Sequence, residues 1–177
     1  NSGAQLQLSA PGYGVQTAWL DGQRVYVDGT SASAPLVAGA VAALVSQNPS
    51  LSPRQAADVL ARTANDTGQP GADPAFGHGI INLATALNGN NASYVDTAVS
   101  SHFYDAETNQ MQFVVQNRSG RPVSGLSLSI TTGTTTSIQT VPSLAAGETY
   151  VAKAPVNDTV LSSAGSLLFF TQLNNPP

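Results

Sequence analysis

The sequence of 177 residues contains no cysteine and few charged side chains. Without cysteine, the chain can form no disulfide and has no thiolate for metal binding or catalysis. Aspartate, glutamate, lysine and arginine together make up 9% of the residues, whereas about 25% is usual in globular proteins. Hydrophobic residues make up 41%, which is enough for a packed core and argues against disorder.

The scarcity of basic residues excludes one class of partner. The six lysines and arginines face ten aspartates and glutamates, so the net charge is −4. Because binding to nucleic acid requires clustered lysine and arginine against the phosphates, we expect no nucleic-acid partner. No apolar run approaches the ~20 residues that a bilayer requires, and we therefore expect no membrane span.

The pattern of apolar and polar residues changes near the middle of the sequence, which predicts two domains. Residues 1–90 mix short apolar stretches with helical patterns. From Ser33 onward, a run of small apolar residues is hydrophobic on all sides, which predicts a buried helix. Ser52 followed by Pro53 predicts the start of a second helix, and a third is expected at about 82–87.

Residues 91–177 lack helical periodicity and contain short strand-like runs instead. These runs lie at 111–115, 126–130, 137–141 and 167–170 and are separated by turn signals. Strands at this spacing predict a small antiparallel β-sandwich.

The segment 28–39 (Asp-Gly-Thr-Ser-Ala-Ser-Ala-Pro-Leu-Val-Ala-Gly) carries the most informative pattern. It places Ser31 after a glycine turn, at the start of the expected helix. The N-terminus of a helix has unpaired N–H groups and partial positive charge, which can stabilise an oxyanion beside the Ser31 hydroxyl. On position alone, a helix-capping serine without any catalytic role is the better explanation of the pattern, because capping serines are common.

Segment 29–35 closely resembles the Gly-Thr-Ser-x-[Ala/Ser]-x-Pro signature of the subtilisin-like serine proteases. Further landmarks agree with this family in order and spacing. They are the Ala-Pro-Gly turn at 10–12, the helical continuation at 37–39, the following helix at 49–60 and the Gly-His-Gly-Ile-Ile-Asn element at 77–82. Together the landmarks cover about half of the chain.

This resemblance implies both a fold and an activity. Residues 1–90 would be the C-terminal portion of an α/β catalytic domain, with a doubly wound parallel sheet and a buried central helix, and residues 91–177 would follow as the β-sandwich domain. The activity would be that of a serine endopeptidase with an Asp-His-Ser triad. Carried over residue by residue, Ser31 is the nucleophile, Thr30 supports the oxyanion, and Gly29 lines the substrate cleft.

The other two members of such a triad are absent. The family's chain order is Asp, His, Ser, yet the thirty residues before Ser31 contain no histidine. The chain begins without methionine and is expected to be a fragment or a processed piece. The catalytic Asp and His and the oxyanion Asn would belong to the missing N-terminal part, on a separate chain or outside this sequence. His78 and His102 are expected to be structural or surface residues, because a general base must reach the serine.

The resemblance also bears on cofactors, substrates and location. Calcium is compatible with the family, but we identify no ligands in this chain, because the loop carboxylates Asp66 and Asp73 are more simply explained as solvated side chains. No other cofactor is expected. The substrates would be proteins or peptides, and the protein would be bacterial and secreted or otherwise extracytoplasmic.

Two alternatives stay open. A sedolisin-like Ser-Glu-Asp acid peptidase shares a Gly-Thr-Ser-x-x-x-Pro motif, although the landmarks at 10–12 and 77–82 fit subtilisins better. The chain could instead be a non-catalytic binding or structural fragment, since residues 95–177 carry no recognisable catalytic constellation.

Overall fold

The structure of the chain is a computed structural model that describes residues 2–89, 91, 93–132, 135–156 and 169–174. The chain divides into two compact units, Asn1–Asn90 and Asn91–Pro177.

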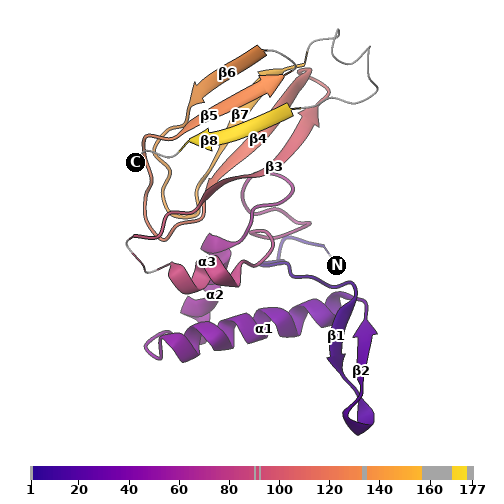
Figure 1. The fold of residues 1–177 in the computed structure, drawn as a ribbon. Coiled ribbons are helices and arrows are strands. Elements are labelled where there is room, and N and C mark those ends of the chain that lie inside the picture. Colours follow the sequence, from indigo (N-terminus) through magenta and orange to yellow (C-terminus); the bar gives the residue numbers. More distant parts are fainter. Residues whose placement is uncertain (1, 90, 92, 133–134, 157–168, 175–177) are drawn as a thin grey trace. The chain divides into compact units, whose positions relative to one another are not determined.

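The first unit contains a β-hairpin (Figure 1). Its strands β1 (Val15–Ala18) and β2 (Arg24–Val27) pair antiparallel, with Val15 opposite Val27. The short 3-10 helix η1 (Leu20–Gly22) closes the turn between them.

Helices make up most of the remaining regular structure of the first unit. They are α1 (Thr30–Gln47), α2 (Pro53–Thr63) and α3 (Leu83–Asn88). The predicted start of α2 is confirmed: the Ser52 hydroxyl accepts a hydrogen bond from the backbone N–H of Gln55 (3.3 Å), and the Gln55 side chain accepts one from the Ser52 N–H (2.8 Å). This reciprocal pair satisfies two N–H groups that the helix start would otherwise leave unbonded.

The core of the first unit lies where the helices meet. Most of its side chains are small, which allows the helix backbones to approach one another closely. The buried members are Ala40, Leu44, Ala56, Leu60 and Ala86.

Within this chain, α1 is not the buried central helix that is expected of a complete catalytic domain. Of the 18 residues of α1, only Ala32, Ala40 and Leu44 are buried. The reason is that α2 and α3 pack against one face of α1, and no parallel sheet among the described residues covers the others. The parallel pairing found in the described part of this unit is the isolated bridge between Ser9 and Ile80, whereas the hairpin is antiparallel.

Helix α1 also bears on the expectation that the chain has no membrane span. By length and composition alone it could cross a membrane, a test that the core helix of a soluble protein also passes. The absence of a membrane span therefore stays a prediction.

The second unit contains two three-stranded antiparallel sheets among its described residues (Figure 1). The strand order in the first sheet is β3 (Thr97–Asp105), β4 (Gln110–Asn117), β7 (Thr149–Pro155). The order in the second is β6 (Thr135–Thr140), β5 (Ser127–Thr132), β8 (Phe169–Asn174). Of the strand expected at 167–170, the first two residues lie outside the described part of the chain.

One hydrophobic cluster joins the two sheets. On β4, the side chains of Met111, Phe113 and Val115 point to the same face, as the two-residue period of a strand requires. They share the cluster with Leu128 and Ile130 of β5. The second unit therefore has a hydrophobic core of its own, built by both sheets.

A buried asparagine connects the loops next to this core. The Asn117 side chain is fully buried, and its Nδ2 donates to the carbonyls of Arg121, Leu144 and Ala145 at 2.8, 3.0 and 3.0 Å. Its Oδ1 accepts from the N–H of Ser119 at 2.9 Å. One side chain thus supplies hydrogen bonds to backbone groups of several loop segments.

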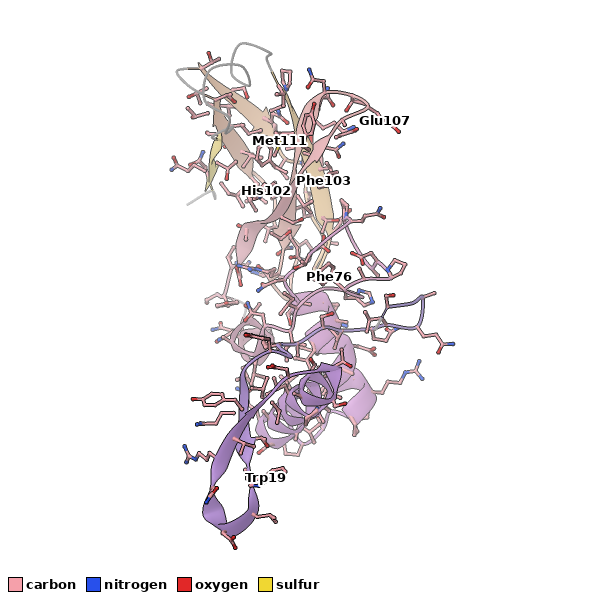
Figure 2. The ribbon with its side chains drawn as sticks, turned by 90° about the vertical axis from the view of Figure 1, so that its right-hand side faces the viewer. Trp19, Phe76, His102, Phe103, Glu107 and Met111 are labelled. Carbon is pink, nitrogen blue, oxygen red and sulfur yellow. The ribbon has the colours of Figure 1, made fainter. Side chains whose placement is uncertain are left out.

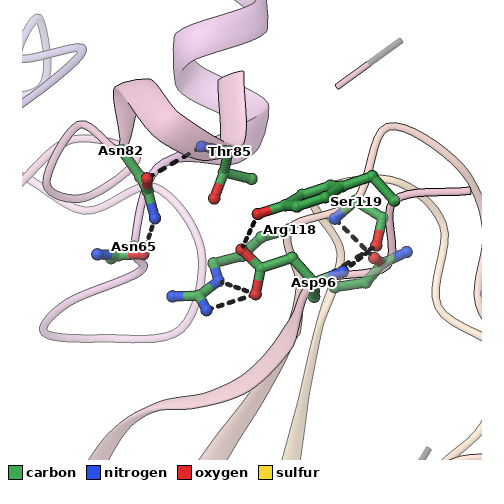
Figure 3. A network of polar contacts seen from close by, with 8 residues as sticks. Asn65, Asn82, Thr85, Asp96, Arg118 and Ser119 are labelled. Carbon is green, nitrogen blue, oxygen red and sulfur yellow. Dashed lines mark hydrogen bonds and ion pairs between the residues drawn. The ribbon is translucent and has the colours of Figure 1, made fainter. Parts of the chain in front are cut away.

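Side-chain hydrogen bonds also fix chain segments within each unit (Figure 3). In the first unit, the Asn82 side chain accepts from the N–H of Thr85 at 3.1 Å and thereby caps α3. In the second unit, Asp96 forms an ion pair with Arg118 at 2.5 Å, and its N–H donates to the Ser119 hydroxyl at 2.8 Å.

Candidate active site

Segment 29–35 forms the start of α1. Gly29 is the N-cap residue, with φ 132° and ψ 160°, a conformation that residues with a side chain rarely adopt. Thr30 and Ser31 are the first two residues of the helix. Their N–H groups are therefore among the four that a helix leaves without an intrahelical acceptor. This places Ser31 at the positive end of the helix dipole.

The turn at 10–12 holds the start of α1 in place. The Gly29 N–H donates to the Gly12 carbonyl at 2.6 Å, and the Ser33 hydroxyl donates to the Pro11 carbonyl at 3.2 Å. A Cβ atom at Gly12 would lie 2.6 Å from Ser33 Oγ and 3.0 Å from the Gly29 carbonyl oxygen. A side chain at position 12 would therefore force the Ser33 hydroxyl and the Gly29 carbonyl to shift, whereas glycine permits the close contact between the turn and the helix start.

Ser31 lines a cleft of about 390 Å³ whose walls come from the hairpin and α1. Its side chain is exposed and makes no hydrogen bond within the described residues. The hydroxyl is thus accessible from the cleft. The other lining residues are Val15, Gln16, Thr17, Val27, Asp28, Ala32, Pro35 and Leu36.

Thr30 lines a different cleft, of about 480 Å³, together with Ser33. This second cleft is mainly apolar, and its other lining residues are Leu6, Leu8, Ser9, Ala10, Pro11, Ala34, Val37, Ala75, Phe76 and Ile80. The structure therefore brings Gly29, Thr30 and Ser31 together at the start of one helix but directs the last two toward separate clefts.

Neither histidine lines the Ser31 cleft. His78 is exposed, and its backbone N–H donates to the Gln7 carbonyl at 2.9 Å. His102, labelled in Figure 2, is exposed on β3, where the centre of its ring lies 6.4 Å from that of Phe113. The described residues that line the cleft therefore include no histidine that could act as a base for Ser31.

The two loop carboxylates accept hydrogen bonds within their own loop, and the expectation that both are solvated is wrong for Asp66, which is buried. Asp73 Oδ1 accepts from the N–H groups of Ala75 and Phe76 at 2.7 and 2.9 Å. Asp66 is buried and accepts from the Gly71 N–H at 3.0 Å, and its burial raises the pKa of the carboxyl group above the ordinary value. In the part of the chain that the structure describes, no three His, Asp or Glu side chains gather as a metal site.

Sequence reasoning missed the contact by which the hairpin borders the segment that carries Ser31. Asp28 Oδ1 accepts a hydrogen bond from the Gly14 N–H at 2.7 Å and so ties the two ends of the hairpin together. A carboxylate beside a glycine turn was the available signal, but the contact joins residues 14 positions apart. It could be recognised only once the register of β1 and β2 was known.

The first part of the chain is similar to known proteins. Residues 1–79 match the model of the subtilase family. An extracellular serine protease of Serratia marcescens is 34% identical over 112 residues, which is 63% of this chain and 10% of that protein. Subtilisin DY of Bacillus licheniformis is 36% identical over 84 residues, 48% of this chain and 30% of that protein. A cell wall-associated protease of Bacillus subtilis is 38% identical over 66 residues, 37% of this chain and 7% of that protein.

The chain thus spans 30% or less of the length of these relatives. The family match covers the hairpin and the helices α1 and α2, and it therefore includes Ser31. The segment that carries Ser31 is therefore the part of the chain that is similar to the subtilase family.

Proposed function

We propose that the chain supplies the nucleophile of a serine endopeptidase, which hydrolyses peptide bonds with an Asp-His-Ser triad. The observation that carries this proposal is the position of Ser31. It is exposed, it is the second residue of α1, and it lies in a cleft inside the segment that matches the subtilase family. Two of the relatives are named as serine proteases or subtilisins, which supports the same chemistry.

In the proposed reaction, the Ser31 hydroxyl oxygen attacks the carbonyl carbon of the scissile peptide bond. A histidine takes the hydroxyl proton and passes it to the leaving amine, while an aspartate orients that histidine. Both groups, and the oxyanion asparagine, would come from a part of the protein outside this chain. This chain therefore contributes the nucleophile and part of its surroundings.

The start of α1 would stabilise the transition state. The negative charge that develops on the carbonyl oxygen would face the backbone N–H of Ser31 and the positive end of the helix dipole. Thr30 lines the neighbouring cleft, and in the proposed site its hydroxyl would support the same oxyanion. Gly29 has no side chain, so a substrate backbone could approach it closely.

The proposal extends to the rest of the molecule. Residues 1–90 would be the C-terminal portion of a doubly wound α/β catalytic domain, and residues 91–177 a β-sandwich appended to it. The hydrophobic cluster shared by both sheets of the second unit supports the sandwich. The substrates would be proteins or peptides. An extracytoplasmic location is supported by relatives named extracellular or cell wall-associated.

Replacing Ser31 in the full-length protein tests the proposal. We expect Ser31→Ala to lower kcat for a peptide substrate by about a thousandfold or more, since the variant lacks the hydroxyl that forms the acyl intermediate. Ser46→Ala is a matched control, because Ser46 is an exposed serine in the same helix that does not line the Ser31 cleft. Circular dichroism would verify that both variants are folded. Undiminished hydrolysis by folded Ser31→Ala protein would overturn the proposal.

A further inference from the structure

We infer that Asp28 gives the cleft beside Ser31 a preference for a basic side chain of the substrate, next to the bond that is cleaved. This inference rests on the proposed function and adds a specificity to the same site. It starts from the composition of the cleft, in which Asp28 is the one charged side chain among the described lining residues. The other lining residues are uncharged, and several are apolar.

The carboxylate is held in place by one of its two oxygens. Oδ1 accepts from the Gly14 N–H at 2.7 Å, which fixes the orientation of the side chain. Among the described residues, Oδ2 takes part in no hydrogen bond or ion pair, and the residue is exposed. Asp28 can therefore accept a hydrogen bond from a substrate ammonium or guanidinium group without breaking its own support.

The basic residue of the hairpin does not neutralise this carboxylate. Arg24 lies opposite Ala18, and Val27 lies opposite Val15. Because successive side chains of a strand point to opposite faces, Arg24 lies on the face of the hairpin away from Val27. Val27 lines the Ser31 cleft and Arg24 does not. The local charge of the cleft is therefore negative.

Geometry connects the carboxylate to the reacting bond. Asp28 and Ser31 are separated by two residues at the helix start and line the same cleft. A peptide whose carbonyl carbon reaches the Ser31 hydroxyl must place a neighbouring side chain in or beside this cleft. A lysine or arginine there would be attracted to Asp28, and a glutamate would be repelled.

The test uses the full-length protein and a set of peptides. Each peptide carries Lys, Ala or Glu at one of the positions flanking the scissile bond, and kcat/KM is measured for each. For the wild-type protein at low salt, we expect Lys to exceed Glu at one position or more. We expect Asp28→Asn to reduce that Lys-to-Glu ratio by about two- to fivefold, the size typical of exposed ion pairs. Asparagine keeps an oxygen that can accept from the Gly14 N–H, so the substitution removes the charge and keeps the support.

Asp21→Asn is the matched control. Asp21 lies in the hairpin turn with φ 55°, a conformation that asparagine adopts readily, and it does not line the cleft. This variant loses the same charge and should keep the wild-type ratio. Raising the salt concentration should reduce the wild-type preference, because salt screens exposed charges.

Two results would overturn the inference. The first concerns the wild-type protein alone: at low salt, kcat/KM for Lys exceeds that for Glu at none of the tested positions. The other is an Asp28→Asn protein whose Lys-to-Glu ratio equals that of Asp21→Asn. In both cases the peptides are still hydrolysed, so the proposed function would stand. A failure of the proposed function would appear instead as activity in Ser31→Ala.

Discussion

Gly29 shows how a single residue shapes the candidate site. Its backbone has φ 132° and ψ 160°, immediately before the first turn of α1. Its N–H is bonded to the Gly12 carbonyl, and its carbonyl accepts from the Ala32 N–H at 2.9 Å. The conformation of one glycine thus connects the turn at 10–12 to the helix that carries Ser31.

We expect Gly29→Ala to lower the free energy of unfolding of this chain by about 1–3 kcal/mol, because alanine is strained in that region of φ and ψ. Gly39→Ala is the control from the interior of α1, where a Cβ atom would meet nothing within 4 Å. It should stabilise the chain by about 0.5–1 kcal/mol, since alanine favours helix. Urea unfolding followed by circular dichroism measures both. Equal changes for the two variants would contradict this account of Gly29.

At the level of residues, the position of Ser31 could be predicted and its surroundings could not. Segment 29–35 indicated a serine at the start of a helix, and the structure has Ser31 there. The contacts of Asp28 with Gly14 and of Ser33 with Pro11 span 14 and 22 residues. Such contacts depend on the position of the hairpin and of the turn relative to α1, which cannot be predicted from a local sequence pattern.

At the level of elements, the start of a helix could be predicted from the sequence because it depends on neighbouring residues. Ser52 and Pro53 define the start of α2 by a side-chain cap and a fixed φ angle. Strands β3 and β7 were not predicted. The pairing of β3 with β4 shifts between Val99 and Ser101, which interrupts the alternation of a regular strand. In β7 the buried positions are occupied by Ala152 and Ala154, and alanine is a weak strand signal.

Asn117 provides a prediction about the connections between strands. Removing its side chain would take one hydrogen bond from each of three loop carbonyls and would remove the side-chain acceptor of the Ser119 N–H. We expect Asn117→Ala to reduce the free energy of unfolding of the second unit by about 2–4 kcal/mol. The urea midpoint of the β-sheet signal in circular dichroism measures this change.

The control for this variant is Asn88→Ala. The exposed Asn88 side chain donates a single hydrogen bond, to the Ala84 carbonyl at 2.9 Å, and its loss should cost less than about 0.5 kcal/mol. If Asn117→Ala cost no more than Asn88→Ala, the buried network would not have the stabilising role described above.

At the level of the whole molecule, α1 is less buried in this chain than its apolar pattern alone predicts. A helix that is apolar on all sides was expected to be buried, yet α2 and α3 cover only one of its faces. The prediction was local, whereas burial depends on which other segments pack against the helix. Apolar surface of this kind is where further parts of a subtilase domain would pack.

The proposed chemistry also depends on parts of the protein outside this chain. Ser31 is accessible, but the described residues that line its cleft include no base. The central claim is therefore that Ser31 becomes a nucleophile only when the histidine and aspartate of another part of the protein are present.

A fluorophosphonate tests this claim most directly, because it reacts covalently with a serine that a neighbouring base has activated. The full-length protein and the 177-residue chain would each be treated, and the modified residue would be located by mass spectrometry of peptides. We predict an adduct on Ser31 in the full-length protein and none on the 177-residue chain alone. Hydrolytically active full-length protein with unmodified Ser31, or equally rapid labelling of Ser31 in the 177-residue chain, would contradict the account.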